Sequence, residues 1–413
     1  MKSNRVFQDL DGFDEFAKYV GLAEAEKSLR RATLARSYMP FRATLHYADL
    51  IRRAPSPDRA ALLNIVTPPD GAAKFEGRFD PYGNISHSLD DATFLQHKYP
   101  RTLLFHITDF CVGNCQFCYK VNEIRLDHSS DAGTERKLSA AISYLSDHRE
   151  IDNVLLTGGD PAAVRPNVLI RAIGSFLDVP HIRAVRFATK VVAYEPTTLG
   201  DARLIDFFSA MNARPGKQVS VIAQINHPAE LDEEALATIG RLRGAGVVVR
   251  GQPAIIAGVN DDVDVLVRLY RSFFDAGIMP YYFTLFMPVR GVEQYAISVV
   301  DGYRLHARAV AQLGGLEKRG TLLLSHNFGK VELVGLLPNA DRPRQAVLRW
   351  HEVVPADSLP EPLRARIACS MGDTFVLDLP EHEVYNLDQL FQANGLPYFD
   401  TDQNLIVGGH DGP

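Results

Sequence analysis

Three of the four cysteines in the chain lie within eight residues, in the stretch ITDFCVGNCQFCYK (107–120). Cys111, Cys115 and Cys118 have the spacing C-x3-C-x2-C. Three thiolates are one ligand short of a structural zinc site, which is almost always four-coordinate. They suit a [4Fe–4S] cluster that keeps one iron open for chemistry. The alternative is a zinc site completed by one of three histidines: His97, His106 or His128.

The cysteines follow the first of six apolar runs that alternate with amphipathic segments. These runs predict strands: TLLFHI (102–107), NVLLT (153–157), AVRFAT (184–189), VSVIAQI (219–225), VVVRG (247–251) and YYFTLF (281–286). Helices are predicted between them, with apolar faces such as Leu138, Ile142 and Leu145, or Leu236, Ile239 and Leu242. This alternation predicts an α/β fold with a parallel sheet, a partial (β/α)6 TIM-like barrel. The cysteine loop then lies at the carboxyl ends of the strands, where such barrels carry their chemistry.

The pattern changes on both sides of the barrel. Residues 1–95 predict an N-terminal helical segment, and residues 96–313 the barrel. Residues 314–413 contain further strand-like runs (TLLLS, AVLRWHEVV and TFVLDL) and predict a C-terminal appendage.

The composition narrows the class of protein. The 413 residues carry a formal net charge of −6, with no basic stripe for nucleic acid. No apolar run reaches the roughly 18 residues of a membrane span, and the first residues are too polar for a signal peptide. Four cysteines are too few for a disulfide framework, so we expect a reducing, cytoplasmic location without nucleic-acid or membrane partners.

The cysteine spacing after a first barrel strand resembles the radical S-adenosylmethionine enzymes. The resemblance implies that S-adenosylmethionine is the missing ligand and yields a 5′-deoxyadenosyl radical. It implies that Phe117 stands near the adenine. The segment LLTGGDP (155–161) resembles the family's glycine-rich strand end, where Gly158 and Gly159 permit close backbone approach and Asp160 offers an acceptor. A reductant protein of the flavodoxin or ferredoxin type is implied as a partner.

A narrower resemblance, over residues 38–355, is to the lysine 2,3-aminomutase group. It rests on MPFRATLHYADLI, HKYPRTLLFHITDFC, VRFATKVVAYEP, INHPAELDEEAL, GQPAIIAGVNDD and PYYFTLFMPVRG, in the order of the group. It implies that Gln252 contacts the cofactor's ribose and that a lysine holds pyridoxal 5′-phosphate (PLP), which carries the migrating nitrogen. Two features favour Lys330 over Lys318 as that lysine. A glycine precedes Lys330, and the number of residues from Lys330 to VLRWHE matches the position of a similar strand in the group.

The chain departs from the group around the substrate. Lys98 replaces an arginine near the PLP phosphate, and Lys120 replaces the arginine that meets the substrate carboxylate. Met287 and Ser325 replace two aspartates that face the ε-ammonium of lysine, although Asp301 or Glu317 could restore one carboxylate. Arg290 could instead meet an acidic side chain of the substrate, an alternative ranked below an uncharged side chain. These changes predict an amino acid substrate other than lysine.

We therefore expect a PLP-dependent aminomutase, an isomerase that makes a β-amino acid from an amino acid other than lysine. The alternative is a PLP-independent radical lyase, dehydrogenase or epimerase acting on an amine-bearing metabolite. A third interpretation is a cluster- or zinc-bearing scaffold without activity. The group's C-terminal cysteine cluster is reduced here to Cys369, so no zinc is expected there. A homo-oligomer is compatible with all three interpretations.

Overall fold

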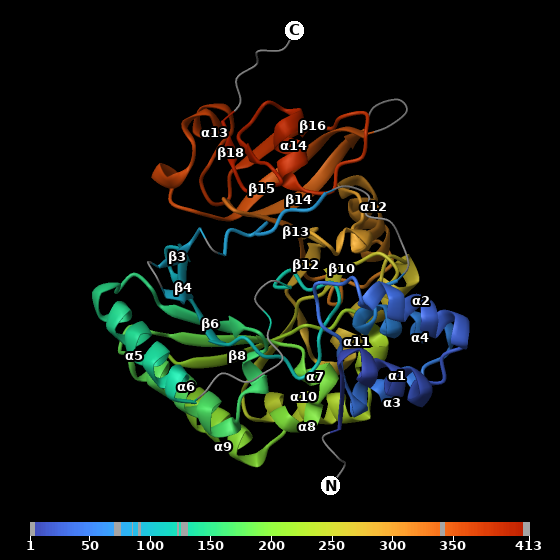
Figure 1. The fold of residues 1–413 in the computed structure, drawn as a ribbon. Helices are drawn as coiled ribbons and strands as arrows, with labels where there is room; N and C mark the ends of the chain where they lie inside the picture. Colours follow the sequence, from blue (N-terminus) through green and yellow to red (C-terminus); the bar gives the residue numbers. More distant parts are fainter. Residues whose placement is uncertain are drawn as a thin grey trace.

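The computed structural model describes residues 5–69, 76–84, 86–89, 92–121, 124, 131–338 and 343–407. Three parts follow one another along the chain in Figure 1: N-terminal helices, a parallel sheet flanked by helices, and a C-terminal antiparallel sheet. None of the helices in these described ranges is both long and apolar enough to cross a membrane.

The N-terminal part is mainly helical, with one short strand pair. Its elements are β1 (Val6–Gln8), α1 (Asp9–Val20), α2 (Glu24–Leu34), β2 (Arg42–Thr44), α3 (Leu45–Arg53) and α4 (Ser56–Val66). Phe13 and Phe16 are buried and pack edge-on against Phe41. The same core includes Tyr194, and Cys115 packs against it. The N-terminal helices therefore share one hydrophobic core with the cysteine loop.

Five consecutive strands form the centre of the parallel sheet. They are β5 (Thr102–Thr108), β6 (Asn153–Gly158), β7 (Ala184–Thr189), β8 (Gln218–Ala223) and β9 (Val248–Gly251), each paired in parallel with the next. The sixth predicted strand is present as β12 (Tyr282–Leu285). The predicted α/β fold with successive parallel strands is therefore confirmed.

The sheet is interrupted where it turns toward its last strands. Gln252 and Pro253 separate β9 from β10 (Ala254–Ile255), and Tyr281 separates β11 (Met279–Pro280) from β12. Proline cannot donate to the ladder, which ends there. Bonds from Tyr281 N to Gly251 O (2.9 Å) and from Thr284 N to Pro253 O (3.0 Å) bridge the break. The wall of the partial barrel thus continues into the second sheet.

The parallel sheet also begins earlier than predicted. Antiparallel β4 (Ala92–Tyr99) pairs with β5, and β3 (Ser88–Leu89) pairs with β4. β4 crosses the predicted boundary at residue 95. Its apolar residues do not alternate strictly, so the strand period is weak in the sequence.

Helices cover the outer face of the sheet (Figure 1). They are α5 (Asp131–Asp147), α6 (Pro166–Asp178), α9 (Ala202–Asn212), α10 (Glu233–Gly244) and α11 (Val263–Ala276). One predicted face is partly wrong, because Leu236 is 41% exposed whereas Ile239 and Leu242 are buried. Each three-residue step rotates the position by about 60°, so Leu236 falls outside the apolar stripe.

The C-terminal part is an antiparallel sheet joined to the barrel wall. β13 (Thr321–His326) pairs in parallel with β12 and then in antiparallel with β14 (Gly329–Pro338). β15 (Pro343–Val353) and β16 (Thr374–Asp378) complete the sheet, and α14 (Leu387–Ala393) contacts β13. Lys330 therefore stands on a hairpin whose first strand belongs to the barrel wall.

A buried charge network connects this hairpin to Arg78, which precedes the barrel, and to Asp388 of α14. Arg78 donates to Asp388 Oδ2 (2.7 Å) and to Asn327 Oδ1 (2.9 Å). His326 Nδ1 accepts from Phe328 N, so its Nε2 donates to Asp388 Oδ1 at 2.9 Å. Burial alone would raise the pKa of the Asp388 carboxyl, but His326 and Arg78 lower it to about 2. The turn before Lys330 is thus fixed by Asp388 from α14.

We expect Asp388→Asn to lower the free energy of unfolding by roughly 3 kcal/mol at pH 7, because it leaves Arg78 buried without its carboxylate. The folded-state pKa lies below the unfolded one, so the contribution is present above about pH 4 and is lost as the pH falls through about 2. Urea unfolding at several pH values measures it. Asp178→Asn, which breaks an exposed pair with Arg214 (3.0 Å), is the control and should change little.

Candidate active site

A cavity of about 320 Å³ opens at the carboxyl ends of β5 to β9. It is lined by every residue that the sequence predicts for the site: Lys98, Cys111, Cys115, Phe117, Cys118, Lys120, Gly158, Gly159, Asp160, Gln252, Met287, Ser325 and Lys330. Such a volume accommodates small-molecule ligands. The chain thus brings together residues more than 230 positions apart in the sequence.

The cysteine loop is held by backbone bonds to the N-terminal part of the chain, one to β2 and one to α4. Asn114 N donates to Arg42 O (2.9 Å), and Gln116 N donates to Ile65 O (2.8 Å). Cys118 N donates to Cys115 O within the loop (3.1 Å). The loop has little regular structure of its own, so the N-terminal segment supplies the partners that fix its course.

None of the three cysteines forms a disulfide, and together they line the cavity. Burial raises the pKa of the Cys111 thiol well above its usual range and that of Cys115 to about 11. These thiols are therefore protonated in the absence of a metal. A bound metal would deprotonate them, because a coordinating cysteine is a thiolate. Cys115 Sγ also lies 3.2 Å from the hydroxyl of Tyr194.

The histidines considered as zinc ligands lie elsewhere. His97 Nδ1 is 2.8 Å from the hydroxyl of Tyr144, and its ring packs edge-on against His148. His106 Nε2 lies 3.1 Å from Lys120 Nζ. Neither His97 nor His106 is among the described residues that line the cavity, and His128 lies outside the described residues.

The glycine turn after β6 packs directly against the start of the cysteine loop. Gly158 has φ +116°, and a Cβ there would lie 1.9 Å from Thr108 O. Gly159 N donates to Thr108 O (2.6 Å), and Asp160 N donates to Phe110 O (2.9 Å). Only glycine permits this approach, so Gly158 and Gly159 set the distance between the two loops.

The carboxylate of Asp160 is buried and held by backbone donors. Its Oδ1 accepts from Ala162 N (2.9 Å), and its Oδ2 accepts from Lys190 N (2.7 Å) and Val191 N (3.2 Å). Burial raises the pKa of this carboxyl, although these donors oppose the effect. Asp160 therefore joins the turn after β6 to the segment after β7.

Phe117 and Gln252 occupy the cavity wall between the cysteines and the second sheet. The ring of Phe117 lies 5.9 Å from that of Tyr295 in an edge-on arrangement. Gln252 N donates to Ala223 O (3.0 Å) at the interruption after β9. The interruption leaves the Gln252 side chain among the residues that line the cavity.

Lys330 begins the return strand of the β13–β14 hairpin and faces two neighbours. In the sheet it pairs with Ser325 on one side and Glu352 on the other. Its Nζ forms an ion pair with Glu352 Oε2 and lies 4.9 Å from the ring centroid of Tyr99. Burial alone would raise the pKa of Glu352, but the Lys330 ammonium holds it below its usual range. Gly329 is required, because a Cβ there would lie 2.2 Å from Glu352 O.

Lys98 is a second cavity lysine near the hairpin. Its Nζ donates to Tyr82 O (2.9 Å) and His326 O (2.7 Å). Burial, reinforced by the charge of Lys330, lowers the pKa of Lys98 to about 7. A lysine with this pKa is partly neutral near physiological pH.

The predicted substrate residues line the same cavity. Lys120 and Met287 are buried, and Ser325 is opposite Lys330. Of the residues that line the cavity within the described ranges, Asp160 is the only carboxylate. The basic residues lining it are more numerous: Lys98, Lys120, Arg186, Lys190 and Lys330.

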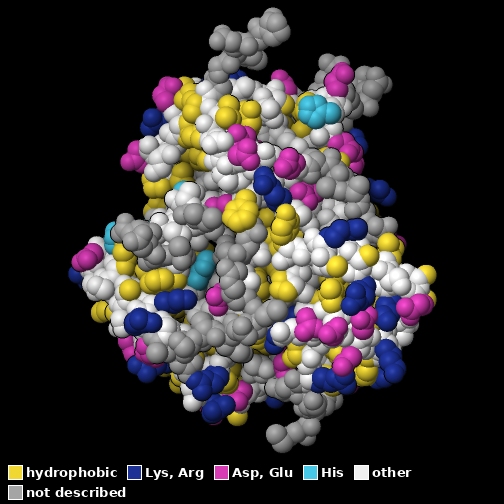
Figure 2. Space-filling model, in the orientation of Figure 1, with side chains coloured by type: hydrophobic (Ala, Val, Ile, Leu, Met, Phe, Trp, Pro, Cys, Tyr) yellow, Lys and Arg dark blue, Asp and Glu magenta, His cyan; other side chains and the backbone are white. Residues whose placement is uncertain are grey.

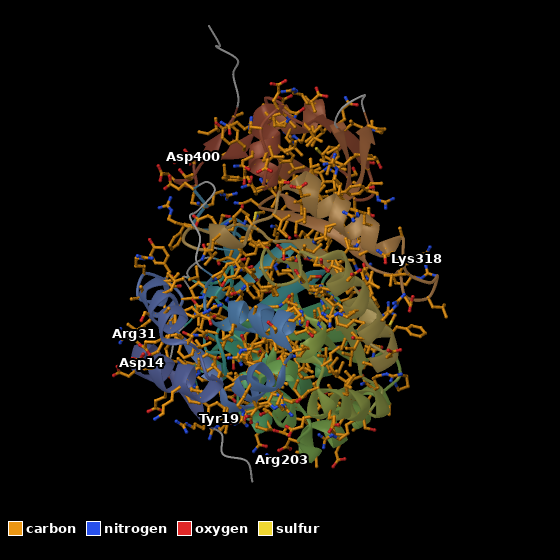
Figure 3. All side chains as sticks on the ribbon, turned by 90° about the vertical axis from the view of Figure 1, so that its right-hand side faces the viewer. Asp14, Tyr19, Arg31, Arg203, Lys318 and Asp400 are labelled. Carbon is orange, nitrogen blue, oxygen red and sulfur yellow. The ribbon has the colours of Figure 1, made fainter. Side chains whose placement is uncertain are left out.

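The alternative residues lie away from the cavity. Lys318 projects at the periphery of the molecule in Figure 3. Glu317 accepts from Gly314 N (2.6 Å), Asp301 Oδ2 accepts from Ser298 Oγ (2.8 Å), and Arg290 donates to Thr401 O (2.9 Å). None of these four lines the cavity in the described part of the chain. Figure 2 shows acidic and basic side chains intermixed on the face that it presents.

The sequence interpretation missed Arg186, Gln96, Glu352 and Tyr194. Arg186 donates to the hydroxyl of Tyr281 (3.0 Å), yet its Nε and Gln96 Nε2 are buried without a hydrogen-bond partner among the described residues. An arginine in the apolar run AVRFAT was a usable signal, because polar residues in buried strands usually serve a site. Glu352 and Tyr194 fall within quoted motifs, but no spacing rule distinguishes them.

Comparison with known proteins gives a consistent set of relatives, although no protein-family model matches. The chain is 33% identical over 242 residues to a putative L-lysine 2,3-aminomutase of Aquifex aeolicus, covering 58% of this chain and 64% of that protein. It is 27% identical to L-lysine 2,3-aminomutase of Escherichia coli, covering 69% and 80%. It is 26% identical to glutamate 2,3-aminomutase of Clostridioides difficile, covering 63% and 59%. The match thus spans about three fifths of the length of the first and the last of these relatives.

Lys98 and Lys330 are coupled electrostatically, and this coupling can be measured. We expect Lys98 to titrate near pH 7 and Lys330→Gln to raise its pKa, because the change removes a neighbouring positive charge and frees Glu352. The pH dependence of acetylation at Lys98, followed by mass spectrometry, reports this value. Lys217→Gln removes a lysine that bonds to Ile182 O, outside the cavity, and should leave Lys98 unchanged. An ordinary lysine titration at Lys98 would contradict the coupling.

Proposed function

We propose that this chain, a divergent member of the lysine 2,3-aminomutase group of radical S-adenosylmethionine proteins, is a PLP-dependent amino acid 2,3-aminomutase. One observation carries the proposal: three cysteine side chains after β5 and the Lys330 amine of β14 line one cavity. The relatives that match are named lysine or glutamate 2,3-aminomutases, which supports an amino acid substrate.

The residues present fit the proposed cofactors. The donor set of Cys111, Cys115 and Cys118 suits a [4Fe–4S] cluster, and Gly158 and Gly159 let the turn after β6 approach the backbone of the cysteine loop, where a Cβ would clash. Arg186 Nε and Gln96 Nε2 are unpartnered buried donors among the described residues, and both residues line the cavity. Such donors suit an anionic group like the phosphate of PLP.

When bound, the cluster with S-adenosylmethionine would supply a carbon-centred radical, and PLP would carry the migrating nitrogen. The chain's own residues would bind and orient. Glu352 Oε2 would hold the Lys330 Nζ against β15. Lys98, whose pKa is lowered to about 7, would lie near the phosphate and could be charged or neutral there. Tyr82, Tyr99, Tyr281 and Tyr282 line the cavity and would exclude water from a radical. A flavodoxin- or ferredoxin-type protein would supply the electron.

For the substrate, we propose an α-amino acid without a distal cation. Asp160, the one carboxylate among the described lining residues, already accepts three backbone bonds. A buried ammonium without a partner costs several kcal/mol. Met287 is apolar and polarizable, and Ser325 offers one hydroxyl, so an uncharged side chain fits best. Lys120 is buried in the lining and would meet the α-carboxylate as a point charge.

Radical S-adenosylmethionine chemistry without PLP is the second candidate, as a lyase, dehydrogenase or epimerase. Two features of the hairpin favour it. Lys330 already forms an ion pair with Glu352. Where the aminomutase group that the chain resembles has a run of glycines before this lysine, the chain has one, Gly329. PLP retention separates the two candidates.

We expect Lys330→Ala to lose the pyridoxyl group that borohydride fixes to the protein, because the amine that would bind PLP is gone. Iron and sulfide contents should stay at the unsubstituted level. Peptide mapping by mass spectrometry locates the label, and Lys318→Ala, at the periphery, is the matched control. Covalent trapping that persists in Lys330→Ala would remove Lys330 from the site.

The substrate proposal is tested by anaerobic reconstitution with a panel of lysine, neutral and acidic amino acids. We expect 5′-deoxyadenosine and a β-amino acid product from a neutral substrate, with lysine at least about tenfold less efficient, since an unpaired ammonium costs more than the 1.4 kcal/mol of a tenfold change. Cys115→Ala serves as the blank. Lysine turnover equal to the best neutral or acidic substrate would refute this substrate class.

A further inference from the structure

The hydroxyl of Tyr194 contacts a candidate cluster ligand. It lies 3.2 Å from Cys115 Sγ. Tyr194 is 1% exposed and ends the short helix α7 (Val191–Tyr194), which follows β7. Its ring packs closely against Gly113 of the cysteine loop: a Cβ added at Gly113 would lie 3.1 Å from atoms of the Tyr194 ring. The tyrosine is therefore fixed against the loop that carries the thiols.

The surroundings of Tyr194 hold it from three sides. Its ring packs edge-on against Tyr47, with centroids 4.7 Å apart. Thr44 Oγ1 donates to Tyr194 O, and Tyr194 N donates to Lys190 O (3.0 Å). Thr44 ends β2 and Tyr47 belongs to α3, so the N-terminal part of the chain contributes to this environment. A side chain held in this way has little freedom to turn from the sulfur.

Metal binding would fix the direction of the Tyr194–Cys115 hydrogen bond. A thiol can donate or accept, but a cysteine sulfur bound to iron is a thiolate and can only accept. The phenol hydroxyl must then donate. Hydrogen bonds to ligating sulfurs stabilise the more negative, reduced form of an iron–sulfur cluster and so raise its reduction potential.

We propose that Tyr194 is a positioning residue that donates a hydrogen bond to the Cys115 thiolate and raises the reduction potential of the cluster. The inference rests on the cluster in the proposed function. It adds to that proposal a residue that sets how readily the cluster accepts the electron needed for chemistry. A backbone donor, Lys120 N, lies 3.4 Å from Cys118 Sγ, so Tyr194 provides a second, side-chain donor on a different cysteine.

A suitable control tyrosine lies in the same core. Tyr295 is fully buried and packs edge-on against Phe117, within the loop. Its hydroxyl donates to Asn64 O at 2.7 Å. Tyr295→Phe therefore removes a buried hydroxyl near the cysteines while leaving the bond to Cys115 in place.

The test is a redox titration of the reconstituted full-length protein, monitored by electron paramagnetic resonance without S-adenosylmethionine or substrate. We expect Tyr194→Phe to shift the cluster midpoint to more negative potential, and Tyr295→Phe to leave it unchanged. A residue that merely filled space would give no shift with phenylalanine, which keeps the ring. An unchanged midpoint in Tyr194→Phe with normal iron content would overturn the inference.

A second substitution covers the case in which Tyr194→Phe fails to fold or to load iron. Site-specific 3-fluorotyrosine at position 194 keeps the ring and hydroxyl but makes the hydroxyl a stronger donor, so the midpoint should shift to more positive potential. No shift there would also overturn the inference. If the unsubstituted protein assembles no cluster, the proposed function fails instead, which separates the two outcomes.

Discussion

One buried carboxylate, Asp160, holds the candidate site together. Its two oxygens accept from backbone groups after β6 and after β7, while its own N–H bonds to the start of the cysteine loop. The segments that follow three strands are thereby fixed relative to one another. They are the cysteine loop after β5, the glycine turn after β6 and the helix after β7 that ends at Tyr194. Because a buried carboxylate without donors is costly, these backbone groups can adopt few other arrangements.

The second half of the cavity depends on a separate set of contacts. Lys330 is placed by a hairpin whose turn is bonded to Arg78, and whose strand lies against Glu352. The two halves meet across the interrupted strands at Gln252 and Tyr281. An unbroken hydrogen-bond ladder at these residues would continue the first sheet. The break instead allows the wall to continue as the second sheet, whose strand β14 places Lys330 in the lining of the cavity.

Much of this arrangement could be predicted from the sequence, because apolar periodicity locates the strands, and consecutive strands of an α/β fold usually lie side by side. The strand AVRFAT forms β7 with the predicted ends, Ala184 and Thr189. The antiparallel β4 was missed because its period is weak. Arg186 carried a usable signal as an arginine in an apolar run. Glu352 could not be assigned to the site, because its role arises from the pairing of β14 with β15, and a periodicity argument treats each strand alone. The site roles of Lys330 and Lys98 stay predictions.

The pairing of Arg78 with Asp388 also has a consequence for biosynthesis. The two residues are 310 positions apart, so at typical synthesis rates Arg78 is made roughly 15 to 60 seconds before its carboxylate partner. During that interval the cysteine loop and the strands β5 to β9 are synthesised, whereas the hairpin that carries Lys330 cannot yet be fixed. The thiols are thus made before the far wall of the cavity, and α14, made after the hairpin, fixes the turn that precedes Lys330.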